Sequence, residues 1–227
     1  LPGVLTNNEA STGLVIRGGN TDQNLILLDG ITVYNPTHFG GIFSNFIVDA
    51  VKEVDLIKGG FNAEYGGRLS SVLNVLSREG NRNRFAGKAS LSLLSGQSTL
   101  EGPFYKGAWL LSGRRTYFDI LLPKVLPAET VKNIPPYYFY DIQGHVFSDL
   151  TEKDRVSFSI YNGIDNLIFD DLGLAANWGN DTYSIAYRRV INEKLLGNFL
   201  LASSKFFTKF NLGGGDGLIN NNKIQDQ

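Results

Sequence analysis

The chain of 227 residues carries 21 lysine and arginine residues against 22 aspartate and glutamate residues, so its net charge of −1 offers no basic excess that would attract nucleic acid. It contains no cysteine, which excludes disulfides and thiolate metal sites within this sequence. No apolar run reaches the roughly 18 residues that a transmembrane helix needs, whereas 26 glycines, 15 phenylalanines and 10 tyrosines favour a β protein.

The first predicted elements are short strands joined by a tight turn. The expected strands are residues 14–16, 25–28 and 31–34. Asp29-Gly30 separates the second from the third, and Asp-Gly between two apolar runs predicts a β-hairpin, because both residues tolerate a positive φ. Asn35-Pro36 ends the hairpin, since proline cannot donate a hydrogen bond to a strand ladder.

The following segment predicts short helices and two more strands. We expect helical pieces over residues 42–47 and 49–51, with Asp49 as an N-cap for the segment leading to Glu53. Two strands are expected at residues 54–57 and 72–76. Short strands, short helices and glycine-rich corners together predict a small α+β unit without a large core.

Beyond a polar, basic connector at residues 78–84, the pattern changes to alternating strands. Apolar residues alternate with small or polar ones, as along residues 155–160 and 182–187, which is the period of a β-strand with two different faces. About seven strands are expected between residues 85 and 210.

The connections between these strands are expected to differ in length. Residues 104–107, 151–154 and 192–194 are short, whereas 117–136, 164–177 and 211 onward are long, the last as an outer loop. Alternation alone fits a soluble β-sandwich equally well. Short turns at one end, long loops at the other and aromatic residues near strand ends favour a transmembrane β-barrel.

Five motifs follow one another in the first third of the chain: LPGV at residues 1–4, IRGG at 16–19, LLDGITVYNP at 27–36, EVDLIKGG at 53–60 and EYGGRLSSVLNV at 64–75. In this order they resemble the plug domain of TonB-dependent outer-membrane receptors, most of all those of Bacteroidetes-type bacteria. The resemblance implies an α+β plug domain over residues 1–80 and antiparallel transmembrane β-barrel strands of an incomplete barrel over residues 81–227. It also implies the outer membrane of a Gram-negative bacterium.

The resemblance implies energised uptake of a scarce ligand, such as a metal chelate, a vitamin or a glycan. A TonB box, expected upstream of Leu1, would engage TonB with its inner-membrane energising complex, and the resulting force would remodel the plug. Further expected partners are outer-membrane lipid and a surface lipoprotein, but not nucleic acid. Two other classes stay open: a non-transporting plugged barrel that is a structural subunit of an envelope assembly, and a soluble binding or enzymatic β domain.

Two residues are expected to lock the plug to the barrel wall. In the family, basic residues of the plug pair with acidic residues of the wall, and the matching positions here are Arg17 and Lys58. Lysine at position 58 lacks the bidentate fork of arginine. The alternative for Arg17 is an ion pair within a tight turn.

Four residues after the predicted hairpin are expected to bind ligand: Tyr34, Asn35, His38 and Phe39. In the family, plug loops of this kind form the floor of the ligand cavity, and aromatic and amide side chains suit a polar ligand with a face that can stack. The alternative is that the aromatic side chains pack in the plug core.

The sequence indicates neither catalysis nor a cofactor. Arg17-Gly18-Gly19 lacks the glycine spacing of a phosphate-binding loop. His38 and His145 are far apart in the sequence and have no cysteine neighbours, so no metal site is expected. We find no Ser-His-Asp grouping that would suggest a hydrolase.

Overall fold

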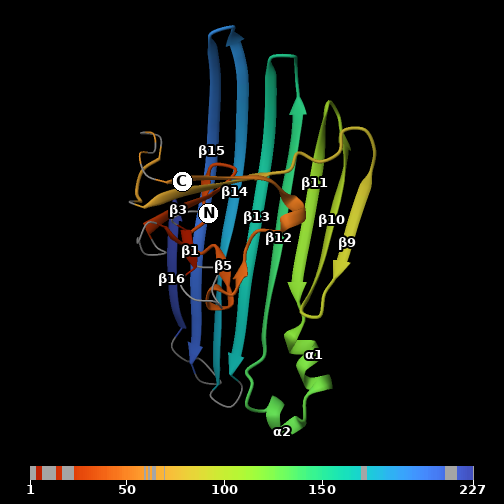
Figure 1. Cartoon of the computed structure of the whole chain (residues 1–227), viewed down its shortest axis with the longest axis vertical. Helices are drawn as coiled ribbons and strands as arrows, with labels where there is room; N and C mark the ends of the chain where they lie inside the picture. The colour runs from red at the N-terminus through yellow and green to blue at the C-terminus, as the bar shows by residue number, and fades with distance from the viewer. Residues whose placement is uncertain are drawn as a thin grey trace.

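The computed structural model describes residues 4–6, 14–16, 23–58, 60, 62, 65–68, 70–169, 173–212 and 219–226. They form a leading unit, which comprises the described residues up to Ser77, and a wall, an eight-stranded antiparallel sheet that begins at Ala86. Figure 1 shows the leading unit lying across the tall strands of the wall. The domain boundary predicted at residue 80 falls in the connector between the two and stays a prediction.

The leading unit is built on a four-stranded sheet with the order β4-β3-β8-β7. Its strands are β3 (Asn24–Leu28), β4 (Ile31–Thr32), β7 (Val51–Lys58) and β8 (Ser71–Ser77). Strand β3 pairs with β8 in parallel, and the other two pairs are antiparallel. Two small antiparallel pairs complete the unit: β1 (Val4–Thr6) with β2 (Leu14–Ile16), and β5 (Thr37–His38) with β6 (Phe43–Ser44).

The predicted hairpin between β3 and β4 is confirmed. Asp29 and Gly30 adopt positive φ angles of 52° and 83°, which is what a two-residue turn between paired strands requires. The carboxylate of Asp29 also accepts hydrogen bonds from the backbone N–H and the hydroxyl of Ser77, at 2.8 and 2.7 Å. The turn is therefore tied to the last residue of β8.

The helix predicted over residues 42–47 is wrong. The segment is a loop that contains β6 and lies between two short 3-10 helices, η2 (Phe39–Gly41) and η3 (Val48–Ala50). Asn45 fixes this loop, because its backbone N–H donates to the Pro36 carbonyl at 3.0 Å and its side-chain amide to the Asn35 carbonyl at 2.6 Å. These bonds to the preceding loop replace the bonds to residue i−4 that a helix would make.

The predicted N-cap at Asp49 is also wrong. The N-cap position of η3 is Ile47, and Asp49 lies inside the helix. Its carboxylate instead reaches the wall, where it accepts from Lys88 Nζ at 2.6 Å and from Gln97 Nε2 at 3.1 Å. The Asp49 side chain therefore joins the leading unit to the wall and does not cap a helix.

The wall contains eight antiparallel strands in chain order, from β9 at one edge to β16 at the other. They are β9 (Ala86–Leu91), β10 (Ser95–Phe104), β11 (Gly107–Thr116), β12 (Tyr137–Asp149), β13 (Asp154–Phe169), β14 (Leu174–Asn192), β15 (Leu195–Leu212) and β16 (Ile219–Asp226). The seven strands predicted between residues 85 and 210 are confirmed as β9 to β15. The loop predicted from residue 211 onward is wrong in part, because β16 lies within it.

The connections fall into two groups at the two ends of the wall. The three predicted short turns join β10 to β11, β12 to β13 and β14 to β15, at the upper end in Figure 1. The long connection 117–136 contains two helices, α1 (Phe118–Val125) and α2 (Ala128–Val131). The long connection predicted over residues 164–177 is wrong, because β13 and β14 extend far into it and pair there, with Asn166 opposite Asn177.

The two faces of the wall differ in chemistry. A row of neighbouring residues facing the leading unit is buried and mostly polar: Thr99, Ser112, Gln143, Tyr161, Thr182 and Ser204. Large apolar side chains on the opposite face are exposed, among them Leu100, Leu111, Phe158, Tyr183, Ile185 and Leu201. This is the alternation predicted from the sequence.

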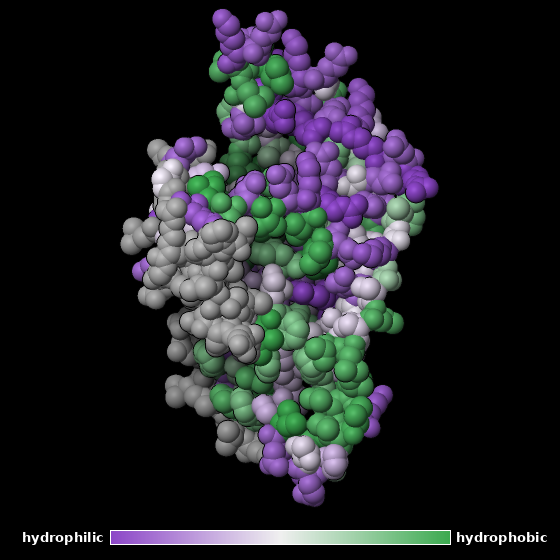
Figure 2. Space-filling view, in the orientation of Figure 1, coloured by the Kyte–Doolittle hydropathy of each residue, from purple (hydrophilic) through white to green (hydrophobic). Residues whose placement is uncertain are grey.

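Hydropathy also varies along the strands. Figure 2 shows hydrophilic side chains gathered at the short-turn end and a hydrophobic area toward the other end, over α1 and the neighbouring strand ends. Across the described ranges, none of the helices has the length and apolar character needed to cross a membrane.

The core of the leading unit includes a residue of the wall. Leu28, Val33 and Val75 form a buried cluster with Tyr161 of β13, whose side chain is completely buried. A second cluster joins Ile47 and Ala50 to Leu110 of β11. The two parts therefore share their apolar packing, which holds the leading unit in one position against the wall.

Candidate functional site

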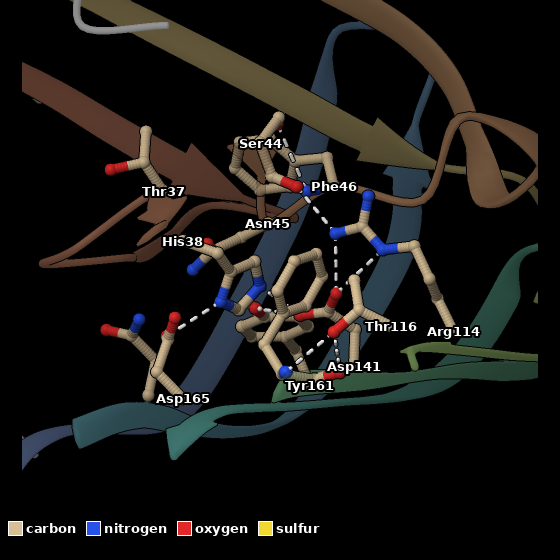
Figure 3. Close-up of polar contacts among 12 residues, drawn as sticks. Thr37, His38, Ser44, Asn45, Phe46, Arg114, Thr116, Asp141, Tyr161 and Asp165 are labelled. Carbon is tan, nitrogen blue, oxygen red and sulfur yellow. Dashed lines mark hydrogen bonds and ion pairs between the residues drawn. The ribbon is translucent and has the colours of Figure 1, made fainter. Parts of the chain in front are cut away.

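His38, at the end of β5, lies between two carboxylates of the wall. Its Nδ1 is 2.7 Å from Asp165 Oδ2 on β13, and its Nε2 is 2.8 Å from Asp141 Oδ1 on β12. The side chains of all three residues are at most 2% exposed. Figure 3 shows the imidazole pointing into this gap from the leading unit.

Arg114 on β11 completes the group. Its Nε and Nη2 both donate to Asp141 Oδ2, at 2.9 and 2.5 Å, and Nη2 also donates to the Ser44 carbonyl of the leading unit at 2.5 Å. We call His38, Arg114, Asp141 and Asp165 the His38 cluster. It joins the leading unit to three strands of the wall through charged groups that are almost fully withdrawn from water.

The imidazole of His38 is also fixed by stacking. It lies parallel to the ring of Phe139 on β12, with ring centroids 4.0 Å apart and an interplanar angle of 5°. The guanidinium of Arg114 lies 5.1 Å from the centroid of the same ring. Phe139 is itself 1% exposed, so the imidazole, the guanidinium and the ring form one packed group.

The His38 cluster favours the protonated imidazole. Burial alone lowers the pKa of His38, but the hydrogen bonds and the charges of Asp141 and Asp165 outweigh burial, and the net pKa is raised above the ordinary value of 6.5. Two buried carboxylates then face two cations, His38 and Arg114.

Phe39, the next residue, is held in an unusual conformation beside this cluster. Its φ is 50°, a left-handed value that costs a phenylalanine about 1 kcal/mol or more. Its backbone N–H donates to Asp165 Oδ1 at 3.2 Å, and its ring packs against Tyr137 with centroids 4.5 Å apart. The hydroxyl of Tyr137 donates to the same carboxylate oxygen. The Phe39 ring remains 45% exposed.

Neutral side chains extend the contact on either side of the His38 cluster. Asn180 of β14 makes a reciprocal pair with the backbone of Asn35, accepting from its N–H at 3.3 Å and donating to its carbonyl at 2.7 Å. Ser204 of β15 donates to the Thr32 carbonyl at 2.6 Å. Backbone groups of the leading unit thus bond directly to side chains of the wall.

The connector is bound at the short-turn end of the wall. Arg78 pairs with Glu101 of β10 at 2.9 Å, and Arg82 pairs with Asp149 of β12 at 2.8 Å. Arg155 of β13 pairs with Glu79 of the connector at 2.8 Å and with Asp149 at 2.6 Å. The chain that links the two parts is therefore attached to three wall strands.

The structure brings three of the four predicted ligand-binding residues to the wall. Asn35, His38 and Phe39 contact it as described above, while Tyr34 is half-buried and lines a small cavity of about 80 Å³ within the leading unit. Both ring nitrogens of His38 face carboxylates of the wall. Phe39 is the most exposed of the four residues. Ligand contact by these residues stays a prediction.

The predicted lock also stays a prediction. Arg17 lies outside the described residues, and Lys58 is the last residue of β7. Sequence reasoning missed Arg114, Asp141 and Asp165. A signal existed for Arg114, because its neighbours along the same face of β11, Ser112 and Thr116, are polar. Asp141 and Asp165 gave no such signal, because Phe139 and Leu167 lie beside them on the same faces of their strands.

The leading part of the chain matches a known protein family. Residues 1–71 match the family model described as TonB-dependent Receptor Plug Domain. The TonB-dependent transporter Oar of Myxococcus xanthus is 32% identical over 101 residues, which are 44% of this chain and 9% of that protein. The chain therefore spans a small part of this relative.

Solved structures share the fold. A mutant of the ferric enterobactin receptor PfeA of Pseudomonas aeruginosa, in complex with enterobactin, has a TM-score of 0.67 at 16% identity and covers 99% of this chain and 42% of its own. The siderophore receptor PirA of the same species has a TM-score of 0.65 at 17% identity, with 99% and 38% covered. The siderophore receptor PiuA of Acinetobacter baumannii has a TM-score of 0.60 at 16% identity, with 91% and 33% covered.

These relatives are named as receptors and transporters, and the structural match extends over both the leading unit and the wall. The bacterial group predicted for the protein is not tested by these matches. Residues 1–71 thus match the TonB-dependent receptor plug domain family, 101 residues are similar to a TonB-dependent transporter, and the fold is shared with solved outer-membrane receptors.

Proposed function

We propose that this chain is the plug and the first barrel strands of a TonB-dependent outer-membrane receptor that takes up a scarce ligand. The plug would comprise residues 1–80 and the barrel strands residues 81–227. The protein would lie in the outer membrane of a Gram-negative bacterium, with TonB and its inner-membrane energising complex as partners. Outer-membrane lipid and a surface lipoprotein are further proposed partners.

One observation carries the proposal: the leading unit covers the polar face of a sheet whose other face exposes large apolar side chains. In a soluble β-sandwich the apolar faces turn toward each other and the polar faces toward water. Here the buried face carries Gln143, Thr182 and Asp141, and the exposed face carries Leu201 and Ile185. A barrel that encloses a polar plug and faces lipid has this arrangement.

The ligand would meet the plug at Phe39. Its loop lies on the side of the leading unit toward the end of the wall that carries α1 and α2, the side that faces outward in the proposed receptor. The half-exposed rings of Tyr34 and Phe39, with Asn35 and His38 behind them, would form part of the floor of the binding cavity. The residues proposed to lock the plug are Arg17 and Lys58.

The ligand class is proposed as a metal chelate, a vitamin or a glycan. Two similar structures are named as siderophore receptors and a third as a ferric enterobactin receptor, which makes ferric enterobactin the first probe to test. The test is accumulation of radiolabelled ferric enterobactin, cobalamin and oligosaccharides by the producing bacterium. Deleting the gene should abolish uptake of one probe class, and deleting TonB should abolish the same uptake. Uptake of every class unchanged in both strains would contradict the proposal.

A second function is favoured by the number of buried contacts between the plug and the wall. A plugged barrel whose plug never moves could be a structural subunit of an envelope assembly, and the shared cores at Tyr161 and Leu110 would suit that role. Co-purification, with and without the TonB box, distinguishes the two functions. Stable co-purification of other envelope proteins, unaffected by loss of the TonB box, would favour the structural subunit.

A further inference from the structure

The His38 cluster is balanced in charge only when His38 is a cation. Asp141 and Asp165 are 0% and 2% exposed, and Arg114 is the other charged group of the cluster. One arginine can compensate one carboxylate. A buried carboxylate without a compensating charge is costly, so the second requires the imidazolium.

The geometry of the imidazole requires the same charge. A neutral imidazole has one N–H donor and one nitrogen lone pair, whereas an imidazolium has two donors. Both nitrogens of His38 face carboxylate oxygens, at 2.7 and 2.8 Å, and a carboxylate can only accept. Loss of either proton would place a lone pair against a carboxylate oxygen within the distance of a hydrogen bond.

The surrounding groups cannot replace this proton. Arg114 is bonded to the other oxygen of Asp141, and the hydroxyls of Tyr161 and Tyr137 donate to Asp141 and Asp165. These donors are present whether or not His38 is protonated, and the Phe139 ring beneath the imidazole is neutral. The bonds that join His38 itself to the wall therefore depend on its own charge.

We propose that His38 is a proton-dependent latch, which holds residues 35–46 of the plug on the wall while it is protonated and releases them when it loses its proton. The biological meaning of the latch rests on the proposed function. In an outer-membrane receptor the loop would respond to the pH outside the cell and would be held most firmly in neutral to acidic surroundings.

The sign follows from proton linkage. The folded pKa of His38 is raised above 6.5, so the closed loop binds a proton more tightly than the open loop does. The stabilisation is fully present below about 6.5, the ordinary pKa, and is lost as the pH rises through the folded pKa. Between these two values the opening constant of the loop should rise by up to tenfold for each unit of pH, and above the folded pKa it should be constant.

Hydrogen–deuterium exchange of the full-length protein in detergent micelles tests the latch without a ligand. Amides of residues 35–46 are compared with amides of β10, which holds none of the residues of the His38 cluster, to correct for the direct effect of pH on exchange. We expect the ratio of the two exchange rates to rise with pH above about 6.5 and then to level off. A ratio that does not change with pH would overturn the proposal.

The other histidine within these 227 residues provides the matched control. His145 lies on β12, where it contacts Ser159 and is 3.9 Å from Asp29 of the leading unit, away from the His38 cluster. His38→Gln should give a high exchange ratio that no longer depends on pH, whereas His145→Gln should keep the wild-type profile. A pH profile that survives in His38→Gln, or that disappears in His145→Gln, would also overturn the latch.

A second variant covers the case in which His38→Gln fails to fold. Asp165→Asn removes one carboxylate and keeps the shape of the side chain, so the rise in the exchange ratio should move to lower pH. An unshifted profile would contradict the latch. Because exchange reports the loop and not transport, a protein that fails the uptake test can still pass this one, and the reverse holds as well.

Discussion

At the scale of single residues, the two buried aspartates organise the interface because each binds groups from both parts of the molecule. Asp165 accepts from His38, from the Phe39 backbone and from Tyr137, and Asp141 accepts from His38 and Arg114. The strained backbone of Phe39 persists because these bonds fix it. Strain held in this way beside an exposed aromatic ring is typical of a binding surface.

Arg114 should not be replaceable by lysine. Lysine cannot donate from two nitrogens to Asp141 and also reach the Ser44 carbonyl, so Arg114→Lys should lower the free energy of unfolding by about 1–3 kcal/mol. Arg115→Lys is the matched control, because Arg115 is 41% exposed and pairs with Asp119 on the surface; it should cost less than about 1 kcal/mol. Denaturant unfolding of the full-length protein in detergent measures both, and equal losses would contradict the role of Arg114.

Gly163 should tolerate no side chain, for reasons of space alone. A Cβ at this position would lie 2.1 Å from the Tyr161 hydroxyl and 2.8 Å from Asp141 Oδ1. Gly163→Ala should therefore displace the groups that hold His38, lowering the free energy of unfolding by about 1–3 kcal/mol and raising exchange in residues 35–46. Gly113→Ala, whose nearest contact would be 3.9 Å away, is the control. Equal exchange of residues 35–46 in the two variants would show that the absence of a side chain at Gly163 is not required.

The sequence could point to His38 and Phe39 but not to their role. They were recognisable because they follow the Asp29-Gly30 hairpin in a segment that resembles a plug motif. The partners of His38 lie 103 and 127 residues further along the chain. No local sequence pattern relates residues so far apart. They come together only because the leading unit packs against β12 and β13.

At the scale of elements, the connector is held on the wall by ion pairs. Three of its charged side chains pair with wall strands, and Arg155 contributes to two of these sites, at Glu79 and Asp149. Its guanidinium also lies 4.5 Å from the centroid of the Phe147 ring. The attachment should keep the end of the plug close to the short turns.

Removing Arg155 should loosen the connector. Arg155→Ala takes away the partner of Glu79 and one partner of Asp149, so trypsin should cut the connector after its arginines more often. If the pairs together contribute about 1.4 kcal/mol, the cleavage rate should rise about tenfold. Arg189→Ala is the control, because Arg189 pairs with Asp154 and is 56% exposed. Limited proteolysis of the full-length protein measures both rates, and equal rates would mean that the connector is held by other contacts.

Elements that depend on neighbours in the sequence were predictable, and those that depend on distant partners were not. The β3–β4 hairpin follows from Asp29 and Gly30, and the short turns follow from charged breaks between alternating runs. Residues 164–177 look like a loop because they are rich in asparagine, aspartate and glycine. Residues 164–169 and 174–177 are strand because β13 and β14 pair there, with Asn177 donating to Asn166 at 2.5 Å.

At the scale of the whole molecule, the two faces of the wall have the opposite polarity to those of a sheet that is stable alone in water. Its buried face is polar because the leading unit supplies hydrogen-bonding partners, and its other face exposes apolar side chains. Its outer strands β9 and β16 each have a single neighbour in the sheet. Both features are explained if the sheet continues into a closed barrel that faces lipid.

A charge on the exposed apolar face tests this explanation directly. Ile185 on β14 is 51% exposed and lies opposite Phe158 and Leu201, which are also exposed. If this face contacts lipid, Ile185→Lys should cost about 2–4 kcal/mol near the middle of the bilayer. The folded fraction of the full-length protein in outer membranes, measured by heat-modifiable gel mobility, should then fall.

The control is a charge placed where no lipid is expected. Glu193→Lys lies in the short turn between β14 and β15 and should leave the folded fraction unchanged, because charged residues already surround it at that end of the wall. In water an exposed isoleucine can be replaced by lysine at little cost, since both side chains remain solvated. If Ile185→Lys behaves like Glu193→Lys, the exposed face of the wall is not in contact with lipid, and the outer-membrane location proposed for this protein fails with it.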